Sequence, residues 1–249
     1  MIRLYLPDDL SGGALVVLGR EQSHYLANVM RMQAGETLAL FNGRHGQWRA
    51  VAEKVAKTAV ALRVMEQTRT QAPEPDLWLL AAPIKKDRID LVAEKAAELG
   101  ASLLWPVLTR RTVVARVNLE RLAANMTEAA EQCERLSVPE LRPPLDLARV
   151  LEGWDAARPL LWLDESGTGR PAAAVLAGLS PGPLAVLSGP EGGFDVHERA
   201  LLARQPCVSP LSLGPRILRA ETAAIAALSL VQALLGDWNS GPRAPYCPV

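Results

Sequence analysis

The stretch LAVLSGPEGGFD, residues 184–195, joins an apolar run to a glycine-rich bend. Residues 184–187 predict a buried strand, and Asp195 with Glu198 three residues later forms a capping-box pattern, which predicts a helix start. In an open α/β sheet, this order of strand, bend and helix places backbone N–H groups at the carboxyl edge, where ligands bind. The stretch therefore predicts either a ligand-binding loop or a simple tight turn.

A second bend of this kind, LGPRILR at residues 213–219, follows an apolar segment at 208–213 and precedes a predicted helix. Two such loops on adjacent strand ends would enclose a flat, mostly apolar ligand with polar ends, such as an adenosine-containing cofactor. Arg219 opposes the dipole of the helix that follows it, which indicates either a functional role or a nearby carboxylate partner. Dinucleotide, P-loop and hydrolase motifs are absent from the sequence.

The rest of the chain predicts two kinds of structure. A small β-barrel with a hairpin at Asn42-Gly43 and a short helix at 24–31 is predicted by apolar segments at 15–18, 37–41, 47–51 and 59–64. Residues 68–75 form a polar linker. Beyond it, a parallel sheet covered on both faces is predicted by strands at 77–82, 103–108, 160–163, 184–187 and 208–213, alternating with helices at 87–99, from 118 and at 220–235.

Composition limits the possible functions of these 249 residues. No apolar run is long enough to cross a bilayer and the first residues lack a signal-peptide core, so we expect a soluble, cytoplasmic protein. The cysteines at 133, 207 and 247 and the three histidines share no ligand spacing, so we expect no metal site. Residues 1–70 carry nine Lys and Arg against six Asp and Glu, which suits a polyanionic partner but also lies within ordinary scatter.

Basic residues follow two neighbouring predicted strands. Lys85, Lys86 and Arg88 come after the strand at 77–82, while Arg110 and Arg111 come after the strand at 103–108. Because parallel strands end at one edge, both clusters can reach the same rim and grip phosphates. The alternative for either cluster is a solvated charged face.

Residues 189–194 (GPEGGF) and 213–223 (LGPRILRAETA) resemble the two signature loops of the RsmE family of SPOUT methyltransferases. The resemblance spans residues 2–236 and continues in the segments 24–31, 41–43, 85–88, 94–100, 106–111 and 128–135. Two positions depart from the family pattern: Ala220 stands where a hydroxylated residue is usual, and Cys133 where a small residue is common.

The resemblance implies an α/β fold with a PUA-like RNA-binding β-barrel at 1–70 and a SPOUT methyltransferase domain at 73–249, whose parallel sheet contains a deep trefoil knot. It implies methyl transfer from S-adenosylmethionine to N3 of a uridine in 16S ribosomal RNA, in an assembled 30S particle, by a homodimer. The implied cofactor-binding residues are Leu187, Gly189, Pro190, Gly192, Gly193, Leu213, Gly214, Ile217 and Leu218.

Within that reaction, Arg219 is the expected stabiliser of the uracil anion and Glu191 the expected orienting group or proton acceptor. The alternative for Glu191 is a carboxylate that caps neighbouring amides. The expected RNA-binding residues are Arg31, Lys85, Lys86, Arg88, Arg110, Arg111 and Arg135. Two other functions stay open: a SPOUT enzyme acting on transfer RNA or ribose hydroxyls, and a catalytically silent RNA-binding factor. The intact glycine loops count against the second.

Overall fold

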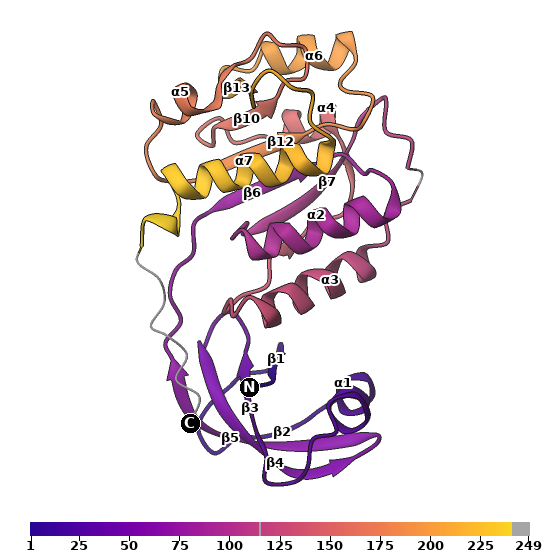
Figure 1. Cartoon of the computed structure of the whole chain (residues 1–249), viewed down its shortest axis with the longest axis vertical. Helices are drawn as coiled ribbons and strands as arrows, with labels where there is room; N and C mark the ends of the chain where they lie inside the picture. Colours follow the sequence, from indigo (N-terminus) through magenta and orange to yellow (C-terminus); the bar gives the residue numbers. More distant parts are fainter. Residues whose placement is uncertain (115, 241–249) are drawn as a thin grey trace. The chain divides into compact units, whose positions relative to one another are not determined.

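The computed structural model describes residues 1–114 and 116–240, without the side chain of Lys86. The described chain divides into two compact units (Figure 1). The front unit comprises Met1–Pro73 and Ala130–Val138, and the sheet unit comprises Glu74–Ala129 and the described residues from Pro139 onward. The sequence did not associate residues 130–138 with the front part of the chain.

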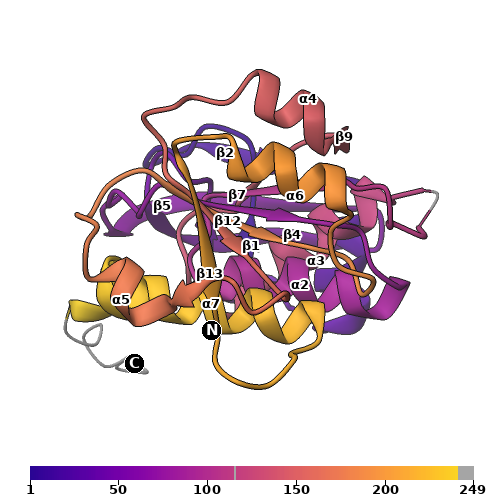
Figure 2. The same ribbon diagram turned by 90° about the horizontal axis from the view of Figure 1, so that it is seen from above.

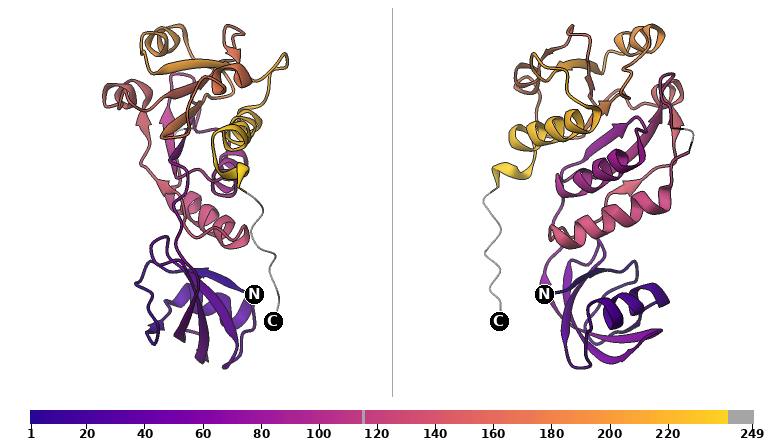
Figure 3. Two further views of the ribbon diagram at one scale, coloured as in Figure 1. Left: turned by 90° about the vertical axis from the view of Figure 1, so that its left-hand side faces the viewer. Right: turned by 45° about the vertical axis from the view of Figure 1, so that its right-hand side comes forward.

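The front unit is a curved sheet wrapped around an apolar core, with a second, smaller apolar cluster around Phe41 (Figure 3). Its strands lie in the order β1-β3-β4-β5-β2, with β1 parallel to β3 and the other neighbours antiparallel. The strands are β1(Arg3–Tyr5), β2(Leu15–Val17), β3(Thr37–Phe41), β4(Gln47–Ala56) and β5(Ala59–Arg69). The prediction for β3 is confirmed, while β4 and β5 run further than predicted and β1 was not predicted.

The helix predicted at 24–31 has different bounds. Helix α1(Arg20–His24) begins earlier and continues into a π-helical turn, η1(Tyr25–Val29). The chain then leaves the turn at Arg31, whose φ of 54° is left-handed. Leu26 is fully buried in the front core, which explains why this segment packs as a helix against the strands.

Arg3 attaches residues 130–138 to the front unit. Its buried guanidinium donates hydrogen bonds to the carbonyl oxygens of Ala130, Glu131 and Arg135 at 2.8–2.9 Å. The same guanidinium lies 4.4 Å from the centroid of the Phe41 ring. These hydrogen bonds satisfy the donors of a buried arginine, so the segment is held by specific contacts.

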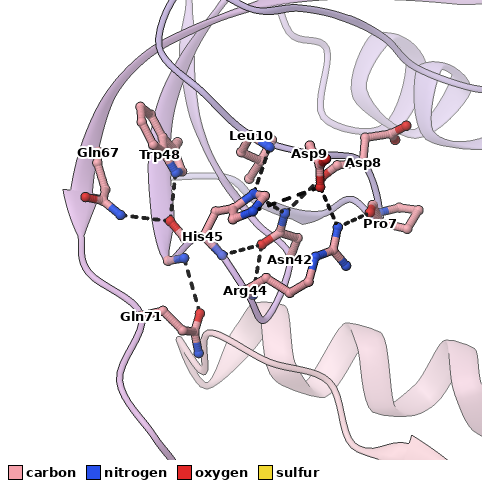
Figure 4. A network of polar contacts seen from close by, with 11 residues as sticks. Pro7, Asp8, Asp9, Leu10, Asn42, Arg44, His45, Trp48, Gln67 and Gln71 are labelled. Atoms are coloured by element: carbon pink, nitrogen blue, oxygen red, sulfur yellow. Dashed lines mark hydrogen bonds and ion pairs between the residues drawn. The ribbon is translucent and has the colours of Figure 1, made fainter.

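The hairpin loop predicted at Asn42-Gly43 is fixed by its own side chains (Figure 4). The Asn42 carboxamide accepts hydrogen bonds from the amides of Arg44 and His45 at 3.0 and 2.8 Å. The His45 carbonyl accepts hydrogen bonds from the Trp48 indole and the Gln67 side chain. Gly43 has a φ of 78°, which a side chain rarely adopts.

The sheet unit contains the predicted parallel sheet, with the strand order β11-β13-β10-β12-β6-β7-β8 and with β9 paired to β7. Each strand pair in this sheet is parallel. The strands are β6(Leu77–Ala81), β7(Leu103–Leu108), β8(Glu140–Leu141), β9(Leu145–Asp146), β10(Leu160–Leu163), β11(Arg170–Pro171), β12(Leu184–Ser188) and β13(Val208–Ser212). The predicted strands are confirmed to within a residue, and the short ones were not predicted.

Helices cover both faces of this sheet (Figure 2). One face carries α4(Leu147–Glu152) and α6(Val196–Ala203), and the other carries α2(Lys86–Glu98), α5(Ala172–Leu176) and α7(Ala220–Leu234). Helix α3(Leu119–Gln132) is capped by Asn118, whose side chain accepts a hydrogen bond from the Arg121 amide at 3.0 Å. The 3₁₀ turn η2(Asp237–Asn239) follows α7. Both halves of the Asp195 and Glu198 capping box are present at α6. The α/β prediction is confirmed, while the trefoil knot stays a prediction.

Candidate active site

Three adjacent strands end at the candidate site. The two glycine-rich loops follow β12 and β13. These strands were predicted to be neighbours, but β10 lies between them. The loop after β10, residues 164–169, therefore takes part in the site. Sequence reasoning missed this loop, although its sequence DESGTG after an apolar strand was a usable signal.

The first of two cavities has a volume of about 420 Å³, and we call it the Gly214 cavity. Its walls come from the loops after β10 and β13 and from the start of α7. The lining combines apolar side chains with the carboxylates of Asp164 and Glu165 and with Arg216. It includes Leu163, Asp164, Glu165, Leu211, Leu213, Gly214, Ile217, Leu218 and Ala223.

The second cavity has a volume of about 470 Å³, and we call it the Gly189 cavity. It adds the loop after β12, the first turn of α2 and the residue that precedes α7. It includes Arg88, Ser188, Gly189, Pro190, Glu191, Gly192, Gly193, Arg219 and Ala220. Both cavities share Leu163, Glu165, Ile217, Leu218 and Ala223, so they adjoin along these residues.

The predicted cofactor residues are mostly brought together here. Gly189, Pro190, Gly192 and Gly193 line the Gly189 cavity, and the Leu213 and Gly214 pair lines the Gly214 cavity. Ile217 and Leu218 line both. Leu187 is the exception, because its side chain is fully buried in the sheet core and lines neither cavity.

The two key glycines are required for different reasons. Gly214 has a φ of 105°, and a Cβ at this position would contact nothing within 4 Å. At Gly189 a Cβ would lie 2.6 Å from the ring of Phe194, a residue that is 2% exposed. The tight packing at Gly189 is therefore against the protein itself, whereas Gly214 faces open space.

The loop after β10 is organised by a buried carboxylate. Asp164 accepts hydrogen bonds from the Ser166 amide and hydroxyl at 3.0 and 2.7 Å and from the Thr168 hydroxyl at 2.6 Å. Burial alone would raise the pKa of Asp164, but these hydrogen bonds and the nearby Arg199 guanidinium outweigh it and lower the pKa. Next to it, Glu165 accepts a hydrogen bond from the Phe194 amide at 3.1 Å, which links two of the three loops.

Charged side chains meet in the Gly189 cavity. Arg88 lies between two carboxylates, with its Nε 3.5 Å from Glu221 Oε1 and its Nη1 4.0 Å from Glu191 Oε1. Arg219 is exposed and, within the described residues, makes no side-chain hydrogen bond or ion pair. Its cation is therefore not neutralised by a neighbouring carboxylate, which was the alternative to a functional role.

Glu191 does not cap its neighbours. Among the described residues its carboxylate accepts no hydrogen bond from a backbone amide, and its one recorded partner is Arg88. The loop is held instead by Arg111, which donates to the Gly192 carbonyl at 2.7 Å, and by the Ser188 hydroxyl, which donates to the Ala220 carbonyl at 3.2 Å.

The predicted RNA-binding residues have different environments. Lys85 and Arg31 are exposed, and Arg110 is exposed with its guanidinium 3.4 Å from Asp195 Oδ2. The hydrogen bond from the Glu198 amide lowers the pKa of Asp195, and Arg110 adds to this lowering, while partial burial opposes it. The Lys86 side chain lies outside the described part of the structure.

Two of these predictions conflict with the geometry. Arg135 is 4% exposed and donates to the Ser137 hydroxyl at 3.2 Å, so its side chain is buried and not open to solvent. Arg88 is directed at the cavity carboxylates and not at an open rim. The sequence could not reveal either case, because a long arginine side chain can reach inward from an apparently exposed position.

Within the described residues, no group of His, Cys, Asp or Glu side chains is arranged to hold a metal ion. Cys133 and Cys207 are free thiols, while Cys247 lies outside the described residues. The helices of residues 1–114 and 116–240 include none that is both long and apolar enough to span a membrane.

Comparison with protein families places both parts of the chain. Residues 71–232 match the RNA methyltransferase domain family, and residues 18–65 match the RNA methyltransferase PUA domain family. The ribosomal RNA small subunit methyltransferase E of Rickettsia conorii is 32% identical over 94% of this chain and 96% of its own length. The chain belongs to the ribosomal RNA small subunit methyltransferase E family. The chain is also 33% identical to the ribosomal RNA small subunit methyltransferase E of Synechocystis, over 89% of this chain and 74% of the relative.

Solved structures agree with membership in the RsmE family. A putative methyltransferase of Legionella pneumophila in complex with S-adenosylmethionine has a TM-score of 0.84 and 33% identity, covering 95% of this chain and 98% of its own. The RsmE of Neisseria gonorrhoeae bound to S-adenosylmethionine has a TM-score of 0.85 and 28% identity, covering 96% and 99%. The predicted α/β fold class is thereby confirmed, apart from the knot, and the family match of residues 18–65 confirms the PUA-type front module.

Proposed function

We propose that this chain transfers a methyl group from S-adenosylmethionine to N3 of a uridine in 16S ribosomal RNA. The observation that carries the proposal is the meeting of three loops, after β10, β12 and β13, around two adjoining cavities that contain both apolar walls and the cations Arg88 and Arg219. Relatives similar over nearly their whole length are ribosomal RNA small subunit methyltransferases, which favours this substrate over transfer RNA.

The cavities fit S-adenosylmethionine. Ile217 lines both cavities yet is 89% exposed, so a bound ligand would cover an apolar side chain that is otherwise in water. The Gly214 backbone leaves open space where a side chain would stand. The residues that would hold the cofactor are those of the loops 189–193 and 213–218, and when bound it supplies an electrophilic methyl group on a sulfonium.

The side chains of the Gly189 cavity supply what N3 methylation needs. N3 of uridine carries a proton at neutral pH, and its removal spreads negative charge onto the two flanking carbonyl oxygens. Glu191 is half-exposed beside this cavity and accepts no hydrogen bond from the described residues, so it can take the N3 proton. Arg219 lines the same cavity and has donors available for a carbonyl oxygen of the anion.

The remaining parts of the proposal concern the partner and the assembly. We assign RNA guidance to residues 1–70 and methyl transfer to residues 73–249, with a homodimer acting on an assembled 30S particle in the cytoplasm. Exposed Lys85, Arg110 and Arg31 are available to contact phosphates. The match of residues 18–65 to a PUA domain family of RNA methyltransferases supports the assignment of the front unit.

The test is methylation of purified 30S particles with isotope-labelled S-adenosylmethionine, followed by nucleoside mass spectrometry. The proposal predicts one labelled nucleoside, N3-methyluridine. A labelled ribose, or label that enters transfer RNA in preference to the particle, would instead support the alternative SPOUT reactions.

A further inference from the structure

Arg88 is held in place by a buried carboxylate. The Glu221 side chain is 10% exposed, and its Oε2 has no hydrogen-bond partner within the described residues. A buried carboxylate without hydrogen bonds is strongly unfavourable unless a cation compensates it. The Arg88 guanidinium, with its Nε 3.5 Å from Glu221 Oε1, is that cation. Glu221 in α7 therefore fixes the position of the side chain of Arg88, a residue of α2.

The guanidinium nevertheless keeps its donors. Its distances to Glu221 and Glu191, 3.5 and 4.0 Å, are ion-pair distances that exceed those of good hydrogen bonds. No described residue accepts a hydrogen bond from its side chain. Arg88 thus presents a planar fork of N–H groups to the Gly189 cavity, held electrostatically but not yet hydrogen-bonded.

We propose that Arg88 is a second substrate-facing cation, which donates to one of the two uracil oxygens that flank N3 while Arg219 donates to the other. Glu221 is then the positioning residue for Arg88. This inference rests on the proposed function, since it assumes that the Gly189 cavity receives the target uracil. It reassigns Arg88 from the phosphate contact that the sequence suggested.

The charge balance favours uracil over a phosphate. Glu191 and Glu221 both lie at ion-pair distance from Arg88, so a phosphate that approached this guanidinium would also meet two carboxylates. Uracil enters neutral. When the N3–H bond breaks, the proton goes to Glu191 and the electron pair stays on the ring. Protonation neutralises Glu191, so Arg88 loses one negatively charged partner and gains another, the developing uracil anion.

The test compares Arg88→Ala with the unchanged protein and with Arg149→Ala, a control that removes an exposed arginine on α4. Single-turnover methylation of 30S particles is measured at saturating RNA from neutral to alkaline pH. RNA affinity at two salt concentrations and affinity for S-adenosylhomocysteine are measured alongside. We expect Arg88→Ala to lower the rate near neutrality by about 10²-fold, the scale of losing one donor to a developing charge. The rate should recover in part at alkaline pH, while both affinities stay unchanged.

Two further variants separate positioning from folding. Glu221→Gln keeps the shape but removes the anchoring charge, so it should displace the pH profile in the same direction by a smaller amount. Arg88→Lys keeps the charge without the fork and should give an intermediate rate, and it serves if Arg88→Ala does not fold.

Three results would overturn the inference. Weaker RNA binding with a flatter salt dependence, but an unchanged saturating rate, would make Arg88 a phosphate contact. A lower rate with an undisplaced pH profile would make it a structural residue. An undisplaced profile in Glu221→Gln would remove its positioning role. If the unchanged protein itself fails to form N3-methyluridine, the proposed function fails first, and the two failures are therefore distinguishable.

Discussion

Asp164→Asn tests whether the loop after β10 is a built part of the site. Asparagine can keep one oxygen for the Ser166 amide. It loses the second carboxylate oxygen, which accepts from the Ser166 and Thr168 hydroxyls, and the negative charge that lies 3.5 Å from the Arg199 guanidinium. The Asp164 side chain is fully buried, so water cannot replace these contacts. Losing the charge-assisted part should destabilise the protein by about 2 kcal/mol. For a chain of this length that corresponds to a fall in melting temperature of roughly 4–8 °C.

The assay is thermal unfolding by circular dichroism, with calorimetric titration of S-adenosylhomocysteine, because Asp164 also lines the Gly214 cavity. The exposed Asp146, changed to Asn, is the control and should shift stability by less than about 0.5 kcal/mol.

The pKa of Asp164 is lowered in the folded state, so its contribution is complete above the ordinary value of about 3.9 and is lost only as the pH falls below it. The stability gap between the two proteins should therefore be constant from near-neutral to mildly acidic pH. A gap below about 0.5 kcal/mol, or one that closes already near neutrality, would refute the reasoning.

Other predictions follow from the same geometry. Gly214→Val should abolish binding of S-adenosylhomocysteine, because a side chain at this position would fill the space of the cavity and strain a backbone with a φ of 105°. The protein should stay folded, because a Cβ would contact nothing within 4 Å, and retained affinity in calorimetry would show that the cofactor binds elsewhere. Binding should survive a chelator, and its loss would reveal a metal. Arg110→Ala should weaken 30S binding and flatten its salt dependence with cofactor affinity intact, whereas Arg111→Ala should also lower cofactor affinity, since Arg111 holds the Gly192 carbonyl. Light scattering should report a dimer at micromolar concentration, and a monomer would contradict the proposed assembly.

Local patterns predicted the elements of the fold well. Strands β3, β7 and β10 lie at the predicted residues, because a short apolar run between turn signals has few alternatives to a buried strand. The capping box at Asp195 was readable, since it depends on side chains three residues apart. The short elements β1, β8, β9 and β11 were missed because two or three residues carry no periodicity.

The site was predicted in part. The glycine loops after β12 and β13 were found, but the order of the strands was not, because pairing depends on contacts distant in sequence. The position of β10 between them, and with it the roles of Asp164 and Glu165, followed only from the structure. The inward orientation of Arg88 was equally invisible, since its partner Glu221 lies in α7, far away in sequence. The burial of Arg135 depends on tertiary packing and was invisible for that reason.

The most direct test of the central claim is nucleoside mass spectrometry of 16S ribosomal RNA from cells with the gene, without it, and complemented with either the native or the Arg219→Ala protein. The account predicts that one N3-methyluridine disappears on deletion, returns with the native protein and stays absent or strongly reduced with Arg219→Ala. Unchanged N3-methyluridine in the deletion strain, or full restoration by Arg219→Ala, would contradict it.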